Sequence, residues 1–242
     1  NGNNATAVVG RFDLPWAEVH EAVNYTQANS KAGHTIIVMP GDYDEDDMNI
    51  DSNNTRLSII LNGGVTIRMN SGQSIILDGA NMQITGLNQP GRSDISTNPS
   101  SDPDSGATIF SSTDSPVFKI SSASQETYHS VSNLSIINNY TGASDALSMY
   151  VIKDTGSAKK ISIKVKGSLL KQPAATTALM NWTNIASVSV LDISDSVFSY
   201  NRQGWLDTTL GTHASADILL MYLERNTFAE LGTSSLAGEY GH

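Results

Sequence analysis

HTIIVMPGDY, residues 34–43, combines a run of strand-forming side chains with a Pro-Gly turn signal. The run from Thr35 to Met39 is too apolar for an edge strand with one face in water, so we expect a strand that faces a core. Pro40 has no amide hydrogen for a sheet ladder and Gly41 tolerates positive φ, so the chain is expected to turn there. Short strands followed by polar turns recur to the C-terminus, and this recurrence predicts the fold.

The composition limits the class of protein. In a chain of 242 residues, 39% hydrophobic residues are enough for one sizeable all-β domain. The net charge of −10 argues against nucleic acid or an anionic membrane as a partner. No apolar run approaches the roughly 20 residues that span a bilayer. The absence of cysteine excludes disulfides and thiolate metal sites.

The chain divides into a lead-in segment, residues 1–11, and a single domain, residues 12–242. Within the domain a helix is predicted at residues 16–28, because Pro15 suits a first helical turn and Trp16, Val19 and Val23 fall on one face. Its place before the first strand suits it to cover the open end of the strand assembly. Residues 87–116 are rich in Ser, Asp and Pro and are predicted to be a long surface excursion, with an intersubunit arm or a groove wall as the alternative.

The second half of the chain contains repeats. Apolar-polar-apolar triplets recur in steps of 27 residues and then 30, and a second element follows them, with Phe198 and Phe228 30 residues apart. Repetition of short strands with polar corners at this period predicts a solenoid, and a parallel β-helix fits better than helical repeats or a sandwich. The repeated segments are Leu134-Ser-Ile136, Ile161-Ser-Ile163, Val188-Ser-Val190 and Ile218-Leu-Leu220, followed by 167–170, 195–201 and 225–230.

Residues 12–86, and in general character 131–230, resemble the right-handed parallel β-helix (pectate-lyase-like) superfamily. The resemblance rests on the helix at 16–28, the strand and turn at 34–43, and the segments Ile59-Ile-Leu61, Val65-Thr-Ile67, Ile75-Ile-Leu-Asp-Gly79 and Ile84-Thr-Gly86. It implies an all-β, right-handed parallel β-helix with an N-terminal capping α-helix. Pectate lyases, polygalacturonases and phage tailspikes share this fold, so the resemblance implies no single activity.

The acidic run after the first strand is a weak candidate calcium site. Carboxylates at Asp42, Asp44, Asp46 and Asp47 are the kind of oxygen ligands that Ca²⁺ takes, and pectate-lyase-like enzymes bind this ion. Because the run lacks EF-hand spacing, a solvated acidic corner is the preferred interpretation and no cofactor is expected. The five histidines are scattered, without a pair at ligand spacing, and predict neither a zinc site nor a catalytic triad.

If the protein is an enzyme, its catalytic carboxylates are expected at the corners of the second half. A glycoside hydrolase needs two carboxylates in different environments, and stacking of repeats brings corner residues together. The chain lacks the His-Gly and Arg-x-Lys motifs of polygalacturonases. Polar corners of a β-helix also contain Asp for structural reasons, which is the preferred interpretation. The candidates are Asp192, Asp195, Asp207 and Glu224, with Tyr200, Arg202 and Trp205 as candidate glycan contacts.

The expected function is that of a non-enzymatic virion protein, a homotrimeric β-helix that decorates a phage capsid or projects from its tail. Other virion proteins or a surface polysaccharide are the expected partners, at a virion or extracellular location. The missing catalytic motifs, the acidic surface and the small size favour this hypothesis. The alternatives are a β-helix polysaccharide lyase or glycoside hydrolase and a secreted glycan-binding adhesin module.

Overall fold

The computed structural model describes fourteen segments of the chain, and for a few residues in them it describes the backbone alone. Backbone-only residues are 121–122, 152–157, 181, 189, 200, 206–207, 219 and 230. The described segments are 2–11, 13–29, 33–51, 56–78, 81–90, 106–112, 115–122, 126–140, 152–157, 160–172, 179–181, 189–200, 206–207 and 219–230.

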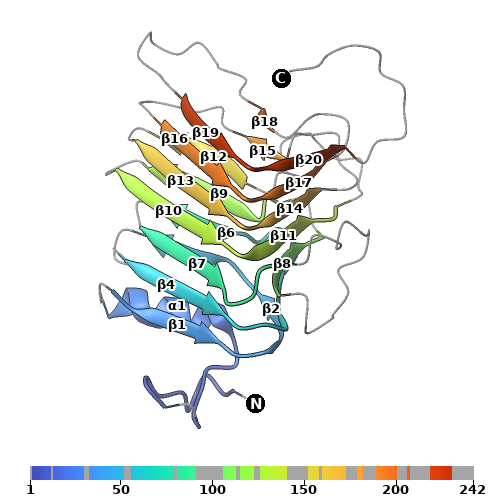
Figure 1. Cartoon of the computed structure of the whole chain (residues 1–242). Coiled ribbons are helices and arrows are strands. Elements are labelled where there is room, and N and C mark those ends of the chain that lie inside the picture. The colour runs from blue at the N-terminus through green and yellow to red at the C-terminus, as the bar shows by residue number, and fades with distance from the viewer. Residues whose placement is uncertain are drawn as a thin grey trace, which may run out of the picture.

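The described chain is mostly β-structure, with one helix and three long parallel sheets (Figure 1). Sheet A contains β1 (Thr35–Val38), β4 (Leu57–Leu61), β7 (Met82–Gly86), β10 (Thr127–Ser132), β13 (Ile161–Lys166), β16 (Ser189–Ser194) and β19 (Leu219–Glu224). Sheet B contains β2 (Gly41–Glu45), β5 (Val65–Met69), β8 (Ala107–Ser111), β11 (Leu134–Asn138), β14 (Leu169–Gln172), β17 (Val197–Tyr200) and β20 (Thr227–Glu230). Sheet C contains β3 (Met48–Asp51), β6 (Ile75–Asp78), β9 (Phe118–Ser122), β12 (Ile152–Ser157), β15 (Met180–Asn181) and β18 (Leu206–Asp207).

Successive strands alternate among the three sheets in a fixed order. The chain passes from sheet A to B to C and then returns to A, so that three consecutive strands form one repeat unit. Each strand pairs in parallel with the equivalent strand of the next unit; Ile36 pairs with Ile59, for example, and Tyr43 with Ile67. This arrangement agrees with the predicted all-β parallel solenoid.

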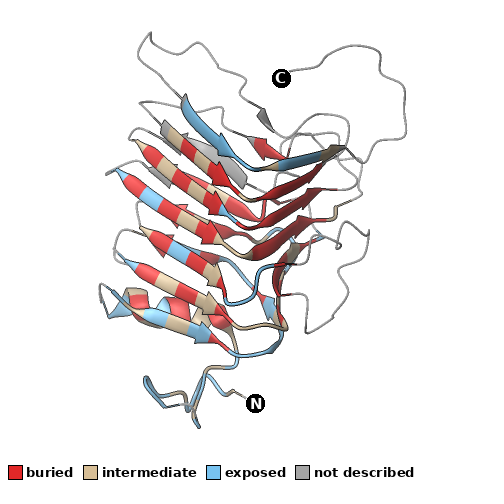
Figure 2. Ribbon diagram, in the orientation of Figure 1, coloured by how far each residue is buried: buried red, intermediate tan, exposed pale blue. Residues whose placement is uncertain are grey.

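The core lies between the sheets and extends from α1 to Ile193 and Phe198 of the unit before the last. Strands β4, β5 and β13 alternate buried residues with half-buried or exposed ones, as expected when one face of a strand points into a core. In contrast, β11 and β14 are buried at every residue (Figure 2). The last unit differs from these two strands, because its strands β19 and β20 carry exposed residues (Figure 2).

Helix α1 (Val19–Ala28) packs against all three strands of the first unit. Its buried face contains Val19, Ala22 and Val23, which the sequence pattern placed together. The helix begins three residues later than predicted, because Glu18 occupies the N-cap position in an extended conformation. With ten residues, α1 is too short to span a membrane, and no other helix lies in the described segments.

Corners between sheets A and B repeat one backbone conformation. Asn133, Gly167, Asp195 and Arg225 all have φ between 54° and 60°. Left-handed backbone at one position turns the chain sharply between two strands, and Asn, Asp and Gly adopt it most readily. The amide N–H of each of the first three donates to a carbonyl in the following unit, to Lys166, Ser194 and Glu224 respectively.

The next corner position carries a ladder of short polar side chains inside the turn. Ser196 Oγ accepts a hydrogen bond from the Ser168 amide at 3.2 Å and donates to the Ser194 carbonyl at 2.8 Å. Asn226 Oδ1 accepts from the Ser196 amide at 3.0 Å, and its Nδ2 donates to the Ile193 carbonyl at 2.9 Å. Buried corner amides are therefore satisfied from one unit to the next, as buried backbone groups require.

Several local predictions need correction. Strand β1 is the edge strand of sheet A, with Val38 alone buried and Ile37 50% exposed, so the first stretch does not face a core over its whole length. Only part of the acidic run lies at a corner, because Gly41–Glu45 is strand β2, whereas Asp46 and Asp47 lie between β2 and β3. Within the predicted surface excursion, Ala107–Ser111 forms strand β8, whereas residues 91–105 lie outside the described segments.

The predicted repeat register is partly correct. Phe198 pairs with Phe228, and Leu170 pairs with Phe198, as the 30-residue step and the weaker copy at 167–170 suggested. However, Ile163 pairs with Leu191 rather than Val190, a step of 28 residues. The 27-residue step would have reversed the inward and outward faces of the strand. Leu134 belongs to sheet B, so it is not equivalent to Ile161 in sheet A.

Candidate functional site

The first turn of α1 is capped by a carboxylate from another element. Glu18 makes no side-chain hydrogen bond to the helix that it precedes. Instead, Glu45, the last residue of β2, accepts hydrogen bonds from the amides of Val19 at 2.6 Å and His20 at 2.8 Å. The Glu45 side chain is completely buried. It satisfies two free amides and places a negative charge at the positive end of the helix dipole.

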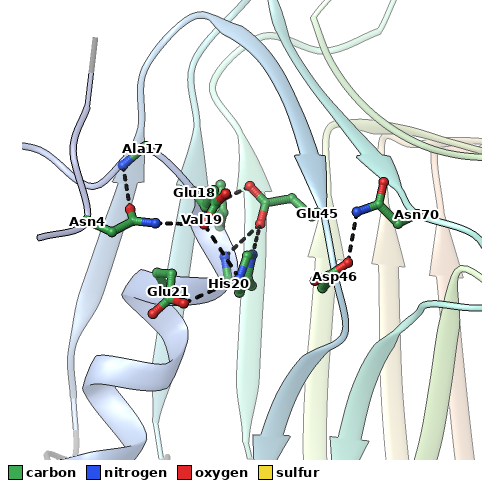
Figure 3. A network of polar contacts seen from close by, with 9 residues as sticks. All are labelled: Asn4, Ala17, Glu18, Val19, His20, Glu21, Glu45, Asp46 and Asn70. Carbon is green, nitrogen blue, oxygen red and sulfur yellow. Dashed lines mark hydrogen bonds and ion pairs between the residues drawn. The ribbon is translucent and has the colours of Figure 1, made fainter.

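His20 lies among three carboxylates at this helix start (Figure 3). Its Nδ1 is 2.7 Å from Oε2 of Glu45. Its Nε2 points the other way, 3.7 Å from Oε2 of Glu18 and 3.6 Å from Oε1 of Glu21. Among the described residues, Glu18, His20 and Glu21 form the one group of three metal-ligating side chains whose donor atoms lie within 4.8 Å of one another.

Asn4 connects the lead-in segment to the same network. Its Nδ2 donates to Oε2 of Glu18 at 2.6 Å, and its Oδ1 accepts from the Ala17 amide at 2.8 Å (Figure 3). The backbone of the lead-in segment is also bonded, since the Asn3 amide donates to the Pro15 carbonyl at 3.0 Å. The segment therefore holds Glu18 in place beside His20.

Three of the four candidate calcium ligands contact the second repeat unit. Asp42 forms an ion pair with Arg68 at 3.0 Å, and Asp46 accepts a hydrogen bond from Asn70 Nδ2 at 2.8 Å. Asp47 Oδ1 accepts from the amide of Ser74 at 2.6 Å. The fourth, Asp44, is exposed on β2. These contacts connect adjacent units along the stack.

The candidate catalytic carboxylates of the second half also contact basic side chains. Lys164 Nζ is 3.0 Å from Oδ2 of Asp192, and this hydrogen bond raises the pKa of the lysine. Arg225 donates to both oxygens of Asp195, at 2.7 Å and 3.0 Å, and forms an ion pair with Glu224. The Arg225–Asp195 and Lys164–Asp192 contacts connect neighbouring units.

The structure describes no side chain for the remaining predicted site residues. Asp207 is in β18 and Tyr200 is at the end of β17, and the structure describes their backbone alone. Arg202 and Trp205 lie outside the described segments. A shallow surface hollow lies beside Asp195, with Gln89, Pro90, Gly167, Ser168, Leu169 and Val197 as its other lining residues.

One row of outward residues crosses sheet A. Pairing places Gln83, Ser130, Lys164, Asp192 and Tyr222 in register on five successive strands. Tyr222 is 60% exposed. This row combines hydrogen-bonding groups with an exposed aromatic ring, a combination typical of surfaces that contact sugars.

Sequence reasoning did not find the network around His20. The histidines of the chain form no pair at ligand spacing, and the partners of His20 come from two separate elements, the helix start and β2. The available signal was Glu18-Val-His-Glu21 at a predicted helix start, where a histidine lies within one turn of two glutamates. The contribution of Glu45 depends on the packing of α1 on the first unit.

Comparisons of the chain with protein families, with curated proteins and with solved structures found no match.

Proposed function

We propose that this chain is a right-handed parallel β-helix of the pectate-lyase-like kind that acts as a non-enzymatic, homotrimeric structural component of a phage virion. In this role the stack of units forms a stiff body on a capsid or tail. Other virion proteins or a surface polysaccharide are its partners. The fold type rests on the sequence resemblance and on the parallel three-sheet order of the strands. The virion setting rests on the sequence alone, through the resemblance and the missing catalytic motifs.

One observation favours a structural role over catalysis. The acidic side chains that suggested a calcium site or a catalytic pair are used largely in contacts between neighbouring units, such as Asp42 with Arg68 and Asp195 with Arg225. A general acid and a nucleophile need carboxylates in different environments beside a substrate. Carboxylates that hold the stack together are suited to rigidity.

An activity assay tests the non-enzymatic part of the proposal. The purified chain is mixed with acidic and neutral polysaccharides, and reducing ends and unsaturated uronate absorbance are followed over time. We expect no turnover above a buffer control. Turnover that Asp195→Asn or Asp192→Asn abolishes, while the matched exposed variant Asp44→Asn keeps it, would contradict a structural role and support a lyase or hydrolase.

Sedimentation tests the assembly. A homotrimer predicts a species of three times the 25.8 kDa chain mass at micromolar concentration. Binding of the same species to purified capsids or tails that lack it tests the virion setting. A monomer that binds no particle contradicts both parts of the proposal.

Glycan binding without catalysis is the second candidate function. The outward row on sheet A favours this function. In that row Tyr222 lies in register with Asp192, and Asp192 forms an ion pair with Lys164 on the next strand. Tyr128, 50% exposed on the same sheet, is a second exposed ring. Glycan-array binding that is lost in Tyr128→Ala and Tyr222→Ala, and kept in Tyr25→Ala on α1, would support this candidate.

A further inference from the structure

We propose that Glu18, His20 and Glu21 form a binding site for a divalent transition-metal ion of the zinc type at the start of α1. Nε2 of His20 and one carboxylate oxygen from each glutamate supply three ligands. A water molecule completes a tetrahedral set, which leaves the ion accessible from solvent. The site is separate from the acidic run that the sequence suggested for calcium.

The distances among the donor atoms fit a metal better than a set of direct hydrogen bonds. Nε2 of His20 is 3.7 Å and 3.6 Å from the two glutamate oxygens. These separations are longer than ordinary N–H···O hydrogen bonds. Zinc lies about 2.1 Å from nitrogen and oxygen ligands in tetrahedral sites, so two of its ligands are about 3.4 Å apart. All three donor atoms lie within 4.8 Å of one another.

The hydrogen bond on the other ring nitrogen prepares His20 for a metal. Glu45 is an acceptor that lies 2.7 Å from Nδ1, so the ring hydrogen of the neutral imidazole belongs on that nitrogen. The lone pair of Nε2 then faces one carboxylate oxygen from each of Glu18 and Glu21, and the Glu18 oxygen also accepts a hydrogen bond from Asn4. A carboxylate that holds the second nitrogen of a histidine is the usual outer partner of a metal-bound imidazole.

The local charge favours a cation. Glu18, Glu21 and Glu45 bring three carboxylates to one imidazole, so the group keeps an excess of negative charge even when the ring is protonated (Figure 3). The helix start offsets only a fraction of one charge. Glu18 and Glu21 are 44% and 42% exposed, which gives an ion a path from solvent, whereas His20 is 14% exposed and held in place.

Hydrogen bonds around the proposed ligands extend to the lead-in segment. Asn4 donates to the Glu18 oxygen that faces His20 and accepts from the Ala17 amide. An ion at this site would therefore connect the lead-in segment, the start of α1 and, through Glu45, the first unit of the stack. The expected consequence of binding is a more stable N-terminal end.

The experiment is a zinc titration of the full chain after removal of metal with a chelator. Calorimetry is expected to show one Zn²⁺ per chain, and Co²⁺ is expected to give the visible absorption of a tetrahedral complex. Thermal unfolding is followed with and without Zn²⁺, since a ligand of the folded state raises the unfolding temperature. Calcium in excess is expected to leave zinc binding unchanged, because an imidazole ligand favours zinc over calcium.

Substitutions of the proposed ligands test which side chains bind the ion. Glu18→Gln and Glu21→Gln change exposed side chains and are expected to keep the fold while they abolish one-to-one binding. Asn4→Ala, which removes an outer contact, is expected to weaken binding by about 10-fold to 100-fold. Asp44→Asn is the matched control, because it removes one exposed carboxylate from the same end of the molecule and should bind as the wild type does.

Two results would overturn the proposal. Absence of stoichiometric zinc binding by the folded wild-type chain would mean that Glu18, His20 and Glu21 contact one another without holding a metal ion. Equal loss of binding in Asp44→Asn and Glu21→Gln, or displacement of zinc by calcium at similar concentration, would indicate diffuse attraction to an acidic surface. Neither result depends on catalytic activity or on virion assembly.

Discussion

Glu45 and His20 lie 25 positions apart in the sequence, and Oε2 of Glu45 is 2.7 Å from Nδ1 of His20. The same carboxylate accepts the amides of Val19 and His20 and is fully buried. One side chain of β2 therefore caps α1, orients a histidine and attaches the helix to the first unit of the stack.

Removal of the cap is expected to destabilise the protein. Glu45→Ala leaves two helix amides without their acceptor in a buried position, so we expect a loss of about 2 kcal/mol in the free energy of unfolding. Urea unfolding followed by circular dichroism measures it. Asp44→Ala, at an exposed position of the same strand, is the control and should change the free energy by less than about 0.5 kcal/mol. Equal losses would contradict the capping role.

His129 makes the stability depend on pH. Burial in sheet A, between Met82 and Ile163, lowers its pKa to about 4, and neither ring nitrogen has a hydrogen-bond partner among the described residues. The unfolded chain takes up a proton near pH 6.5, and the folded chain resists it. Stability from this residue is therefore complete above pH 6.5 and is lost as the pH falls toward 4, by roughly 3 kcal/mol.

His129→Leu tests this dependence. We expect the variant to lose the part of the acid sensitivity between pH 6.5 and 4 that burial of the ring causes. Urea unfolding at several pH values measures the slope in each protein. His34→Leu, at a half-buried position, serves as the control and should keep the wild-type slope. A slope that is the same in all three proteins would show that His129 does not titrate in this range.

Gly167 is required at its corner by conformation and by space. Its φ is 60°, and an added Cβ would lie 2.6 Å from Oδ1 of Asn133. Gly72 has φ of 78°, and an added Cβ there would have no neighbour within 4 Å. We expect Gly72→Ala to cost about 1 kcal/mol through the backbone alone, and Gly167→Ala to cost about 1 kcal/mol more because Asn133 must move. Chemical unfolding compares the two variants.

Substitutions of Phe198 and Phe228 compare packing in the core with packing at the end of the stack. Their rings stack with centroids 5.1 Å apart, and they occupy equivalent positions of adjacent units. Phe198 is fully buried, whereas Phe228 is 39% exposed. We expect Phe198→Ala to cost about 3–5 kcal/mol and Phe228→Ala about 1 kcal/mol. Similar costs in thermal unfolding would show that another group covers the last unit.

Several features of the fold were predictable because they follow from local chemistry. Strand β5 alternates apolar and polar residues, and the helix pattern at 16–28 places Val19 and Val23 on one face. Phe198 and Phe228 occupy matching positions of the sequence repeat, and they pair with each other in the structure. Register was harder to predict, because Val190 and Leu191 are adjacent and both apolar, so the sequence alone does not say which of them pairs with Ile163.

Less of the candidate site than of the fold could be predicted from the sequence. Acidic residues at 42–47 suggested a metal site, and their contacts with Arg68, Asn70 and Ser74 depend on the strand that pairs with them. The corner position of Asp195 was anticipated, and its bidentate contact with Arg225 was not, although the two residues occupy equivalent places in adjacent repeats.

The sequence by itself determined that this protein is built from short strands with polar corners at a repeating period, because side-chain alternation and turn residues act within a few positions. Only the tertiary structure decided which residues share a site. Glu45 reaches His20 because β2 and α1 pack at the same end of the stack, and the acidic side chains bridge units because parallel pairing places them beside their partners. Contacts of this kind arise from stacking over 24 or more positions, which local sequence preferences do not specify.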